Sequence, residues 1–403
     1  MSRSLLYHAW SLQGYHLVSK RFQGGAIYLR IQPVKLFRCS GCGSNKVIRA
    51  GQVLRNFRTV PIGHKPVWIE LPVQRLYCRA CGRTRQAELT FAEPRRSYTR
   101  QFERFVLELS QYTTIQDAAR HLGVGWDLIK EIQKQNLQRR YAQIPLRHLR
   151  HLAIDEISIG HGHRYLTIVL DLDSGAVVFV GEGRGTTALE PFWKRLRKAR
   201  AQIAAVATDR SPAYTAAVHT HLPDAIHVFD RFHVVKLFNE KLSQFRQELQ
   251  REAEGPLQKK VLKGTRWLLL KNPENLDAQR HEHQRLEEAL ALNKPLATAY
   301  YLKEDLRQIW EQKDKSTAAR FLKDWMARAR SSGIRMLQRF ANTLGFHRSG
   351  ILAYYDCRLT TAALEGTNNK MRTMQRRAYG FRDQEFFKLK IYAIHKTTYA
   401  LVG

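Results

Sequence analysis

The chain has 403 residues, of which 67 are Lys or Arg and 35 are Asp or Glu, so its formal net charge is +32. This length excludes a single compact domain, and the 44% hydrophobic content excludes wholesale disorder. The excess positive charge predicts a polyanionic partner, with nucleic acid ahead of an anionic membrane surface. Because no apolar run approaches the ~20 residues of a spanning helix and no secretory signal is evident, we expect a cytosolic or nucleoid-associated protein without a membrane partner.

Two matched cysteine pairs occur in the N-terminal quarter of the chain. Cys39 and Cys42 form one Cys-x-x-Cys pair, Cys78 and Cys81 form the other, and a glycine follows each pair. Four thiolates at this spacing are typical of a closed tetrahedral Zn²⁺ site that is structural and not catalytic. Four unrelated buried cysteines are the alternative, and the matched spacing disfavours it. We therefore predict one structural zinc ion in a zinc-binding domain over residues 1–95.

Residues 96–148 have the pattern of a helix-turn-helix domain. A short helix ends at the glycine turn at 123–125, and a second amphipathic helix starts at Trp126. In such motifs the second helix enters the major groove of DNA. A plain helical hairpin is the alternative, but Arg139 and Arg140 at the end of the second helix favour DNA binding.

Residues 149–238 change to an α/β pattern. A strand at 151–160 is followed by two strands, a basic helix, a strand ending at Asp209, a helix and a strand ending at Asp230. This order is that of a ribonuclease-H-like core. The first strand has Asp155 among apolar residues, and an ionised Asp there is costly unless a cation pairs with it. Because open α/β sheets place their chemistry at strand ends, we expect Asp209 to meet Asp155.

Other carboxylates compete with this pair. Glu156 adjoins Asp155 but should point to the opposite face of the strand. The acids within 171–173 are explained by a hairpin turn between the second and third strands. Asp230 is the credible rival of Asp209, because it also ends a strand.

Residues 239–357 contain no convincing strand and are predicted to form an all-α insertion, with helix over 321–346. Residues 358–403 then return to the core with a helix over 360–377 and a last amphipathic helix over 386–399. The first of these helices has Glu365 near its start and basic residues after it, which suits a helix that holds a metal along a phosphate backbone. A solvated charged face is the alternative. The candidate DNA-contacting residues on this helix are Asn369, Lys370, Arg372, Arg376 and Arg377.

These features together resemble the ISL-three family of bacterial insertion-sequence transposases. The resemblance covers the cysteine pairs, the helix-turn-helix and the segments AIDE, TDRSPAY, VFDRFHVVK and EGTNNKMRTMQRRAYGFRD, in the family's order. It implies a DDE transposase whose catalytic, metal-binding triad would be Asp155, Asp209 and Glu365. Asp230 and His233 would match an accessory Asp-x-x-His motif.

The reaction that the resemblance implies is DNA cleavage and strand transfer at the terminal inverted repeats of an insertion sequence. Such chemistry uses two hard cations about 4 Å apart, and carboxylates suit Mg²⁺ or Mn²⁺. Asp155 would bridge both ions, while Asp209 and Glu365 would each complete one. His233 would contact a distorted base or orient the scissile phosphate, although a core histidine bonded to backbone is an equally good interpretation. Arg210 departs from the family, which more often has an uncharged residue there.

Two other functions stay open from the residues. A structure-specific DNA nuclease would use the same three acids, although the zinc pairs and the helix-turn-helix indicate recognition of particular DNA ends. A transposase-derived DNA-binding regulator would need a dead active site, whereas all three acids are present. The partner we expect is double-stranded DNA, bound by a homodimer because two ends must be brought together. The predicted fold class is multidomain α+β, with a four-cysteine zinc-binding domain, a helix-turn-helix domain, and a ribonuclease-H-like α/β catalytic core interrupted by the all-α insertion.

Overall fold

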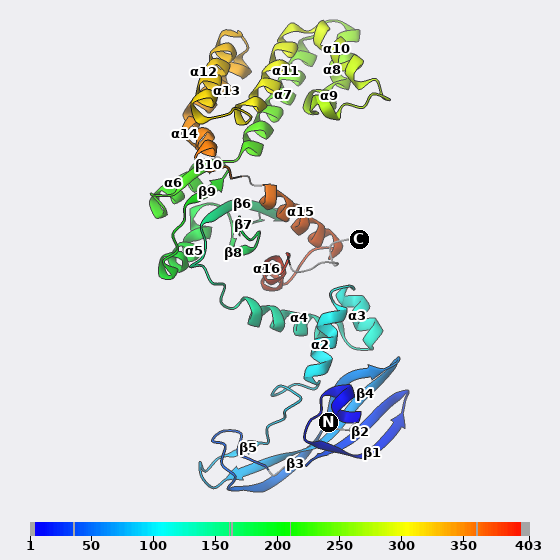
Figure 1. Cartoon of the computed structure of the whole chain (residues 1–403). Helices are drawn as coiled ribbons and strands as arrows, with labels where there is room; N and C mark the ends of the chain where they lie inside the picture. Colours follow the sequence, from blue (N-terminus) through cyan, green and yellow to red (C-terminus); the bar gives the residue numbers. More distant parts are fainter. Residues whose placement is uncertain are drawn as a thin grey trace. The chain divides into compact units, whose positions relative to one another are not determined.

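The computed structural model describes residues 5–34, 37–160, 162, 164–209, 211–359 and 362–395, so Arg210 lies outside the described residues. These ranges divide into two compact units, one ending at Ala142 and one running from Gln143 to His395. Figure 1 follows both units along the sequence. No helix in the described ranges is long and apolar enough to cross a bilayer.

The first unit starts with a short helix and a five-stranded sheet. Its elements are α1 (Leu5–Trp10), β1 (Tyr15–Gln23), β2 (Ala26–Pro33), β3 (Val47–Ile62), β4 (Lys65–Cys78) and β5 (Thr84–Gln86). The strand order is β1-β2-β4-β3, with β5 paired to β4. Burial alternates along β4, because successive side chains of a strand point to opposite faces. Its inward side chains, such as Val67 and Ile69, pack with Phe57 of β3 in a common core.

Three helices complete this unit: α2 (Arg100–Leu109), α3 (Ile115–Leu122) and α4 (Trp126–Tyr141). The hydroxyl of Thr114 caps α3 by accepting a hydrogen bond from the N–H of Asp117. Gly123 ends α3 at a φ of 61°, a left-handed conformation that glycine adopts without strain. Ala119 of α3 and Ile129 of α4 are buried in one hydrophobic cluster. The two helices and the glycine turn are as predicted.

The second unit is built on another five-stranded sheet. Its strands are β6 (His151–Gly160), β7 (Arg164–Asp171), β8 (Val177–Glu182), β9 (Ala205–Thr208) and β10 (Ile226–Phe229). The strand order is β10-β9-β6-β7-β8. β6, β7 and β8 pair antiparallel, whereas β9 pairs parallel with both β6 and β10. This arrangement confirms the predicted ribonuclease-H-like sheet.

Helices α5 (Thr186–Ala199) and α6 (Pro212–His221) pack on one face of this sheet. Their large side chains, including Trp193 and Tyr214, are buried against Ile154 of β6. Because side chains alternate along a strand, Asp155 points away from this layer and Glu156 points into it. The hydroxyl of Tyr214 accordingly donates to Oε2 of Glu156 (3.0 Å). The predicted orientation of Glu156 is thus confirmed.

A helical segment separates β10 from the last core helices. Its helices are α7 (Arg231–Glu252), α8 (Pro256–Gly264), α9 (Arg266–Leu270), α10 (Glu282–Leu292), α11 (Lys294–Arg307), α12 (Lys315–Ser331), α13 (Arg335–Phe346) and α14 (Arg348–Leu352), with short 3-10 turns at Pro273–Asn275, Gln308–Trp310 and Ala353–Tyr355. Residues 239–357, all of which are described, contain no strand. The predicted helix over 321–346 is in fact two helices, because the chain breaks at Gly333 (φ 71°). α7 is continuous across residue 238, the predicted end of the first part of the core, so one helix belongs to both the core and the insertion.

The chain returns to the core with α15 (Ala362–Arg377) and α16 (Gln384–Tyr392). Figure 1 shows α15 beside β6, and the two are in contact. The backbone N–H of Val180 in β8 donates to the hydroxyl of Tyr392, which attaches α16 to the sheet. The prediction for α16 was wrong at both ends: the helix starts at Gln384, two residues before the expected start and capped by Asp383, and it ends at Tyr392. Residues 396–399 of that predicted helix lie outside the described residues.

Candidate active site

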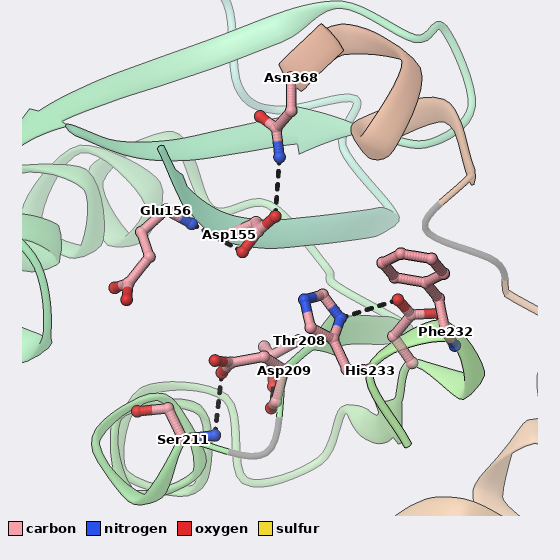
Figure 2. A network of polar contacts seen from close by, with 9 residues as sticks. Asp155, Glu156, Thr208, Asp209, Ser211, Phe232, His233 and Asn368 are labelled. Atoms are coloured by element: carbon pink, nitrogen blue, oxygen red, sulfur yellow. Dashed lines mark hydrogen bonds and ion pairs between the residues drawn. The ribbon is translucent and has the colours of Figure 1, made fainter. Parts of the chain in front are cut away.

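Asp155 and Asp209 are brought together by strand register. Ile154 of β6 pairs with Thr208 of β9, so the two acids are the next residues of two neighbouring parallel strands. β9 ends at Thr208, which places Asp209 at its C-terminal end. Figure 2 shows the imidazole of His233 in the same space as these two carboxylates. This is the edge at which the sequence predicted that the two acids would meet.

The carboxylate of Asp155 is held from two sides. Its Oδ1 accepts a hydrogen bond from the backbone N–H of Glu156 (2.8 Å), and its Oδ2 accepts one from Nδ2 of Asn368 (2.8 Å). Burial raises the pKa of Asp155, the Glu156 N–H and the charge of His233 lower it, and the pKa remains above its ordinary value. In the described part of the chain, no Lys or Arg forms an ion pair with this carboxylate. Its ionised form is therefore supported by the charge of His233 and not by a Lys or Arg among the described residues.

Asp209 is fixed by the residues on either side of it. Its Oδ1 accepts a hydrogen bond from the N–H of Ser211 at the start of α6 (2.9 Å). Its backbone carbonyl accepts one from the hydroxyl of Thr208 (2.6 Å). That hydroxyl oxygen in turn accepts from Nε2 of His227 on β10 (2.8 Å). These bonds define where the backbone turns after β9.

Asp230 and His233 form a pair at the start of α7. Asp230 is buried and caps the helix, since its Oδ1 accepts from the N–H of Phe232 (3.2 Å). Its Oδ2 contacts Nδ1 of His233 at 2.9 Å. Burial alone would lower the pKa of His233, but the Asp230 hydrogen bond and the charges of Asp155 and Asp209 outweigh it and raise the pKa. The imidazolium form is therefore favoured at this place.

The helix α15 brings Asn368, and not Glu365, into contact with Asp155. Glu365 is exposed in the first turn of α15, three residues before Asn368. Among the described residues, only the four cysteines form a group of three or more potential ligands within 4.8 Å of one another, so Asp155, Asp209 and Glu365 are not gathered that closely. Asn368 was missed from the sequence. The i, i+3 spacing from Glu365 could have indicated it, because residues so spaced are neighbours on a helix surface.

Asn368 is only 6% exposed, and its Oδ1 is buried without a hydrogen-bond partner. This amide orientation is the one that an ionised Asp155 requires, because turning the side chain over would set Oδ1 against Oδ2 of Asp155, two acceptors. A buried acceptor left unsatisfied costs about 1–3 kcal/mol. The site therefore contains a neutral oxygen that accepts no hydrogen bond from the described residues.

The predicted DNA-contacting residues are exposed. On α15 they lie on the surface away from Leu364, Thr367 and Met371, which are buried. On α4, Arg139 forms an ion pair with Glu103, and the guanidinium of Arg140 lies 5.9 Å from the ring of Tyr141. The predicted DNA-contacting residues on α15, all exposed, are Asn369, Lys370, Arg372, Arg376 and Arg377.

The four N-terminal cysteines form a separate cluster. The Sγ atoms of Cys39 and Cys81 are 3.8 Å apart, and those of Cys42 and Cys78 are 3.6 Å apart. A tetrahedral Zn²⁺ with bonds of about 2.3 Å sets its sulfur ligands about 3.8 Å apart, so the cluster fits this ion. Donation from the N–H of Gly41 is the largest of the effects that lower the pKa of Cys39, to about 6, which favours the thiolate that a metal needs.

Comparison with known proteins shows which class of protein has this sheet, these acids and these cysteines. A transposase profile matches residues 152–391, a helix-turn-helix domain of transposase family ISL3 matches residues 87–135, and the zinc-finger of transposase IS204/IS1001/IS1096/IS1165 matches residues 35–81. The chain is thus a DNA-cutting transposase with a zinc ribbon that supports a structural zinc ion. It belongs to the ISL3 (ISL-three) family of insertion-sequence transposases, as the sequence motifs predicted.

Individual relatives agree with this assignment. The chain is 33% identical over 401 residues to the transposase of insertion sequence element IS1001 from Bordetella parapertussis, with 98% of each chain covered. It is 29% identical over 391 residues to the transposase of element IS1557 from Mycobacterium tuberculosis, covering 90% of this chain and 87% of that one. Among solved structures, the Drosophila P element transposase strand transfer complex matches 66% of this chain and 81% of its own, at 12% identity and a TM-score of 0.36, a likeness too distant to support an inference.

Proposed function

We propose that this transposase cuts and joins DNA at the terminal inverted repeats of its insertion sequence, with Asp155, Asp209 and Glu365 as ligands of divalent cations. The observation that carries the proposal is the register of β6 and β9, which sets Asp155 and Asp209 side by side. The raised pKa of Asp155 indicates a carboxylate whose charge needs a cation. Glu365 lies three residues before Asn368 on the same helix, which supports its reach towards a cation held at Asp155.

The donors at this edge suit two Mg²⁺ or Mn²⁺ ions. They are carboxylate oxygens and one buried amide oxygen without a partner, the hard ligands that these ions prefer. When bound, the ions activate the attacking oxygen and stabilise the leaving oxygen of a phosphodiester. The chain's own residues hold the acids in place: Asn368 and the Glu156 N–H fix Asp155, and the Ser211 N–H fixes Asp209.

His233 and Asp230 would act beside the acids. Asp230 caps α7 and holds His233. Asp209 directly follows Thr208, the partner of Ile154 in the sheet, so it lies next to Asp155, which supports Asp209 and not Asp230 as the second ligand. The raised pKa of His233 favours an imidazolium, and a cation here suits contact with a phosphate oxygen. His233 would thus orient the scissile phosphate or a distorted base next to it.

DNA would be held by two sets of residues. The helix-turn-helix would place α4 in the major groove, with Arg139 and Arg140 at its end. The exposed basic side of α15 would follow the phosphate backbone near the acids. We further propose that the protein acts as a homodimer, because two element ends must be joined. We also propose that it works in the cytosol, on the nucleoid. The functional divisions would be 1–95, 96–148, 149–238 with 358–403, and the insertion 239–357.

The proposal is tested with duplexes that end in the element's terminal repeats, incubated with the purified protein and Mg²⁺. We expect nicks at the element boundary and products in which that boundary is joined to target DNA. Cuts at any branched DNA without joined products would indicate a structure-specific nuclease instead. Tight binding without cleavage in Mg²⁺ and in Mn²⁺ would indicate a regulator.

A further inference from the structure

The buried amide of Asn368 lies beside Asp155, one of the proposed cation-binding acids. Its Nδ2 donates to Oδ2 of Asp155 (Figure 2), and its Oδ1 has no partner although the residue is only 6% exposed. The two atoms belong to one planar group, so the unpartnered oxygen is necessarily close to the Asp155 carboxylate. An amide oxygen next to cation-binding carboxylates can act as a further oxygen ligand for the same cation.

We propose that Asn368 is the α15 residue that completes the divalent-cation site: its Nδ2 positions Asp155, and its Oδ1 is a neutral oxygen donor for the cation. The inference rests on the proposed function, because it takes Asp155 as a cation ligand. It adds a cation ligand outside the predicted triad, so α15 would contribute two residues to the site, Asn368 and Glu365. Asn368 faces the sheet, whereas Glu365 is exposed in the first turn.

The residue type fits this role. Asp155, Asp209 and Asp230 already bring three carboxylates close to His233, since all three act on its pKa. A further carboxylate at position 368 would repel Asp155, whereas an amide supplies an oxygen without charge and a donor for the neighbouring acid. Asn and Gln carbonyls are known to act as oxygen ligands for hard cations.

The helix is held so that this amide keeps its place. Thr367 and Met371, the neighbours of Asn368 on the buried face of α15, are at most 1% exposed. The hydroxyl of Thr367 contacts Nε2 of His395 at 3.1 Å, and Nε2 of Gln375 donates to the carbonyl of Ile159 on β6 (3.4 Å). Asn368 therefore sits in the middle of a docked face, and its side chain does not depend on a mobile loop.

The test measures Mn²⁺ binding to the zinc-loaded full-length chain by electron paramagnetic resonance of the free ion, without DNA. Partners of metal ligands typically change metal affinity by about 10–100-fold, so we expect Asn368→Ala and Asn368→Leu each to weaken Mn²⁺ binding by at least about tenfold. Asn368→Leu keeps most of the side-chain volume, so a loss in both variants does not come from a cavity. The matched control is Thr373→Ala, an exposed residue of the same helix, which should leave Mn²⁺ affinity unchanged.

A third variant distinguishes the role of the amide oxygen from the role of the amide nitrogen. Asn368→Asp keeps an oxygen but removes the donor. A cation bound between the two carboxylates offsets their repulsion, so we expect Mn²⁺ affinity to be kept while Mg²⁺-dependent cleavage of end DNA falls at least about tenfold. An Asn368→Asp protein that binds Mn²⁺ as weakly as Asn368→Ala would overturn the oxygen-donor role.

Asp155→Ala distinguishes this inference from the proposed function. If it abolishes Mn²⁺ binding while Asn368→Ala and Asn368→Leu bind as tightly as the unaltered chain, the role of Asn368 is wrong and the proposed function stands. If Asp155→Ala itself leaves Mn²⁺ binding unchanged, the proposed cation site fails, and the inference falls with it.

Discussion

Asn368 of α15 donates a 2.8 Å hydrogen bond to Asp155 of β6 across 213 residues of sequence (Figure 2). Seven residues further along α15, Gln375 donates to the carbonyl of Ile159, four residues further along β6. Seven helical residues span about 10 Å and four strand residues about 13 Å, so the helix and the strand run alongside each other in the same direction. The last helices are thus fastened to the first strand of the core although the whole helical insertion lies between them in sequence.

Removal of one cysteine thiolate should abolish zinc binding without affecting the sheet of the second unit. In the variant Cys78→Ser we expect about one zinc fewer per chain and fast proteolysis of the N-terminal sheet, because structural zinc contributes folding energy directly. Residues 143–395 should stay resistant. Atomic absorption and limited proteolysis with mass spectrometry measure both effects. Cys357→Ser is the control, since Cys357 is not part of the cluster, and full zinc content in Cys78→Ser would refute the site.

The basic side of α15 should contribute to the salt dependence of DNA binding. Each of Arg372→Ala and Arg376→Ala should weaken binding to end and unrelated duplexes alike, and should reduce the slope of log affinity against log salt by about 0.9, one phosphate contact. Fluorescence anisotropy over a range of NaCl concentrations measures this slope. Arg328→Ala is the control, because Arg328 already pairs with two acids, Asp305 and Asp324. Unchanged slopes in both α15 variants would contradict the proposed contact.

Two glycines of the second unit should respond in opposite directions to alanine. A Cβ at Gly350 would lie 2.2 Å from the buried ring of Phe229, which ends β10 directly before Asp230. Overpacking of this kind typically costs about 1–3 kcal/mol, so Gly350→Ala should lower the unfolding midpoint. Gly366 of α15 has no atom within 4 Å of its Cβ position, and Gly366→Ala should stabilise by about 0.5–1 kcal/mol. Denaturant titration compares the two, and a Gly350→Ala protein as stable as Gly366→Ala would contradict the packing described.

Acid should weaken the β9–β10 edge through His227. Burial, with a smaller effect of His219, lowers the pKa of His227 from 6.5 to about 4. Between these values the unfolded chain holds a proton that the folded chain does not, so stability is complete above about pH 6.5 and is lost as the pH falls towards 4, by on the order of 3 kcal/mol. His227→Gln should remove this part of the pH dependence, as measured by unfolding from about pH 4 to 7. An identical pH profile in the variant would exclude His227 as its source.

The elements with a local pattern were predictable from the sequence. The strands around Asp155 and Asp209 are short apolar runs, the turn of the helix-turn-helix is marked by Gly123, and the zinc ligands are paired at fixed spacing. The ribonuclease-H-like class of the core also followed, from the order of strands and helices along the chain. Each of these features depends on residues that are close together in the sequence, or on the rules for connecting strands and helices.

The contact of Asn368 with Asp155 was not predictable in this way. Helical spacing arranged Glu365, Asn369, Arg372 and Arg376 on one face, and this face is exposed in the structure. Leu364 and Met371, seven residues apart, mark the buried face of α15, and Asn368 lies between them. That this face meets Asp155 is a tertiary effect without a local signal. The role of Glu365 therefore stays a prediction.

The central claim is that Asp155, Asp209 and Glu365 carry out DNA cleavage. It is tested most directly by Mg²⁺-dependent cleavage of element ends by the variants Asp155→Ala, Asp209→Ala, Asp230→Ala and Glu365→Ala, each checked for folding and DNA binding. Loss of cation stabilisation worth several kcal/mol lowers the rate by about 1,000-fold, so we expect this loss in the three triad variants. Asp230→Ala, which removes the α7 cap and the support of His233 but no proposed cation ligand, should lose less. Robust cleavage by Asp155→Ala or Glu365→Ala would contradict the mechanism, and cleavage by Asp209→Ala with none by Asp230→Ala would reassign the second ligand to Asp230.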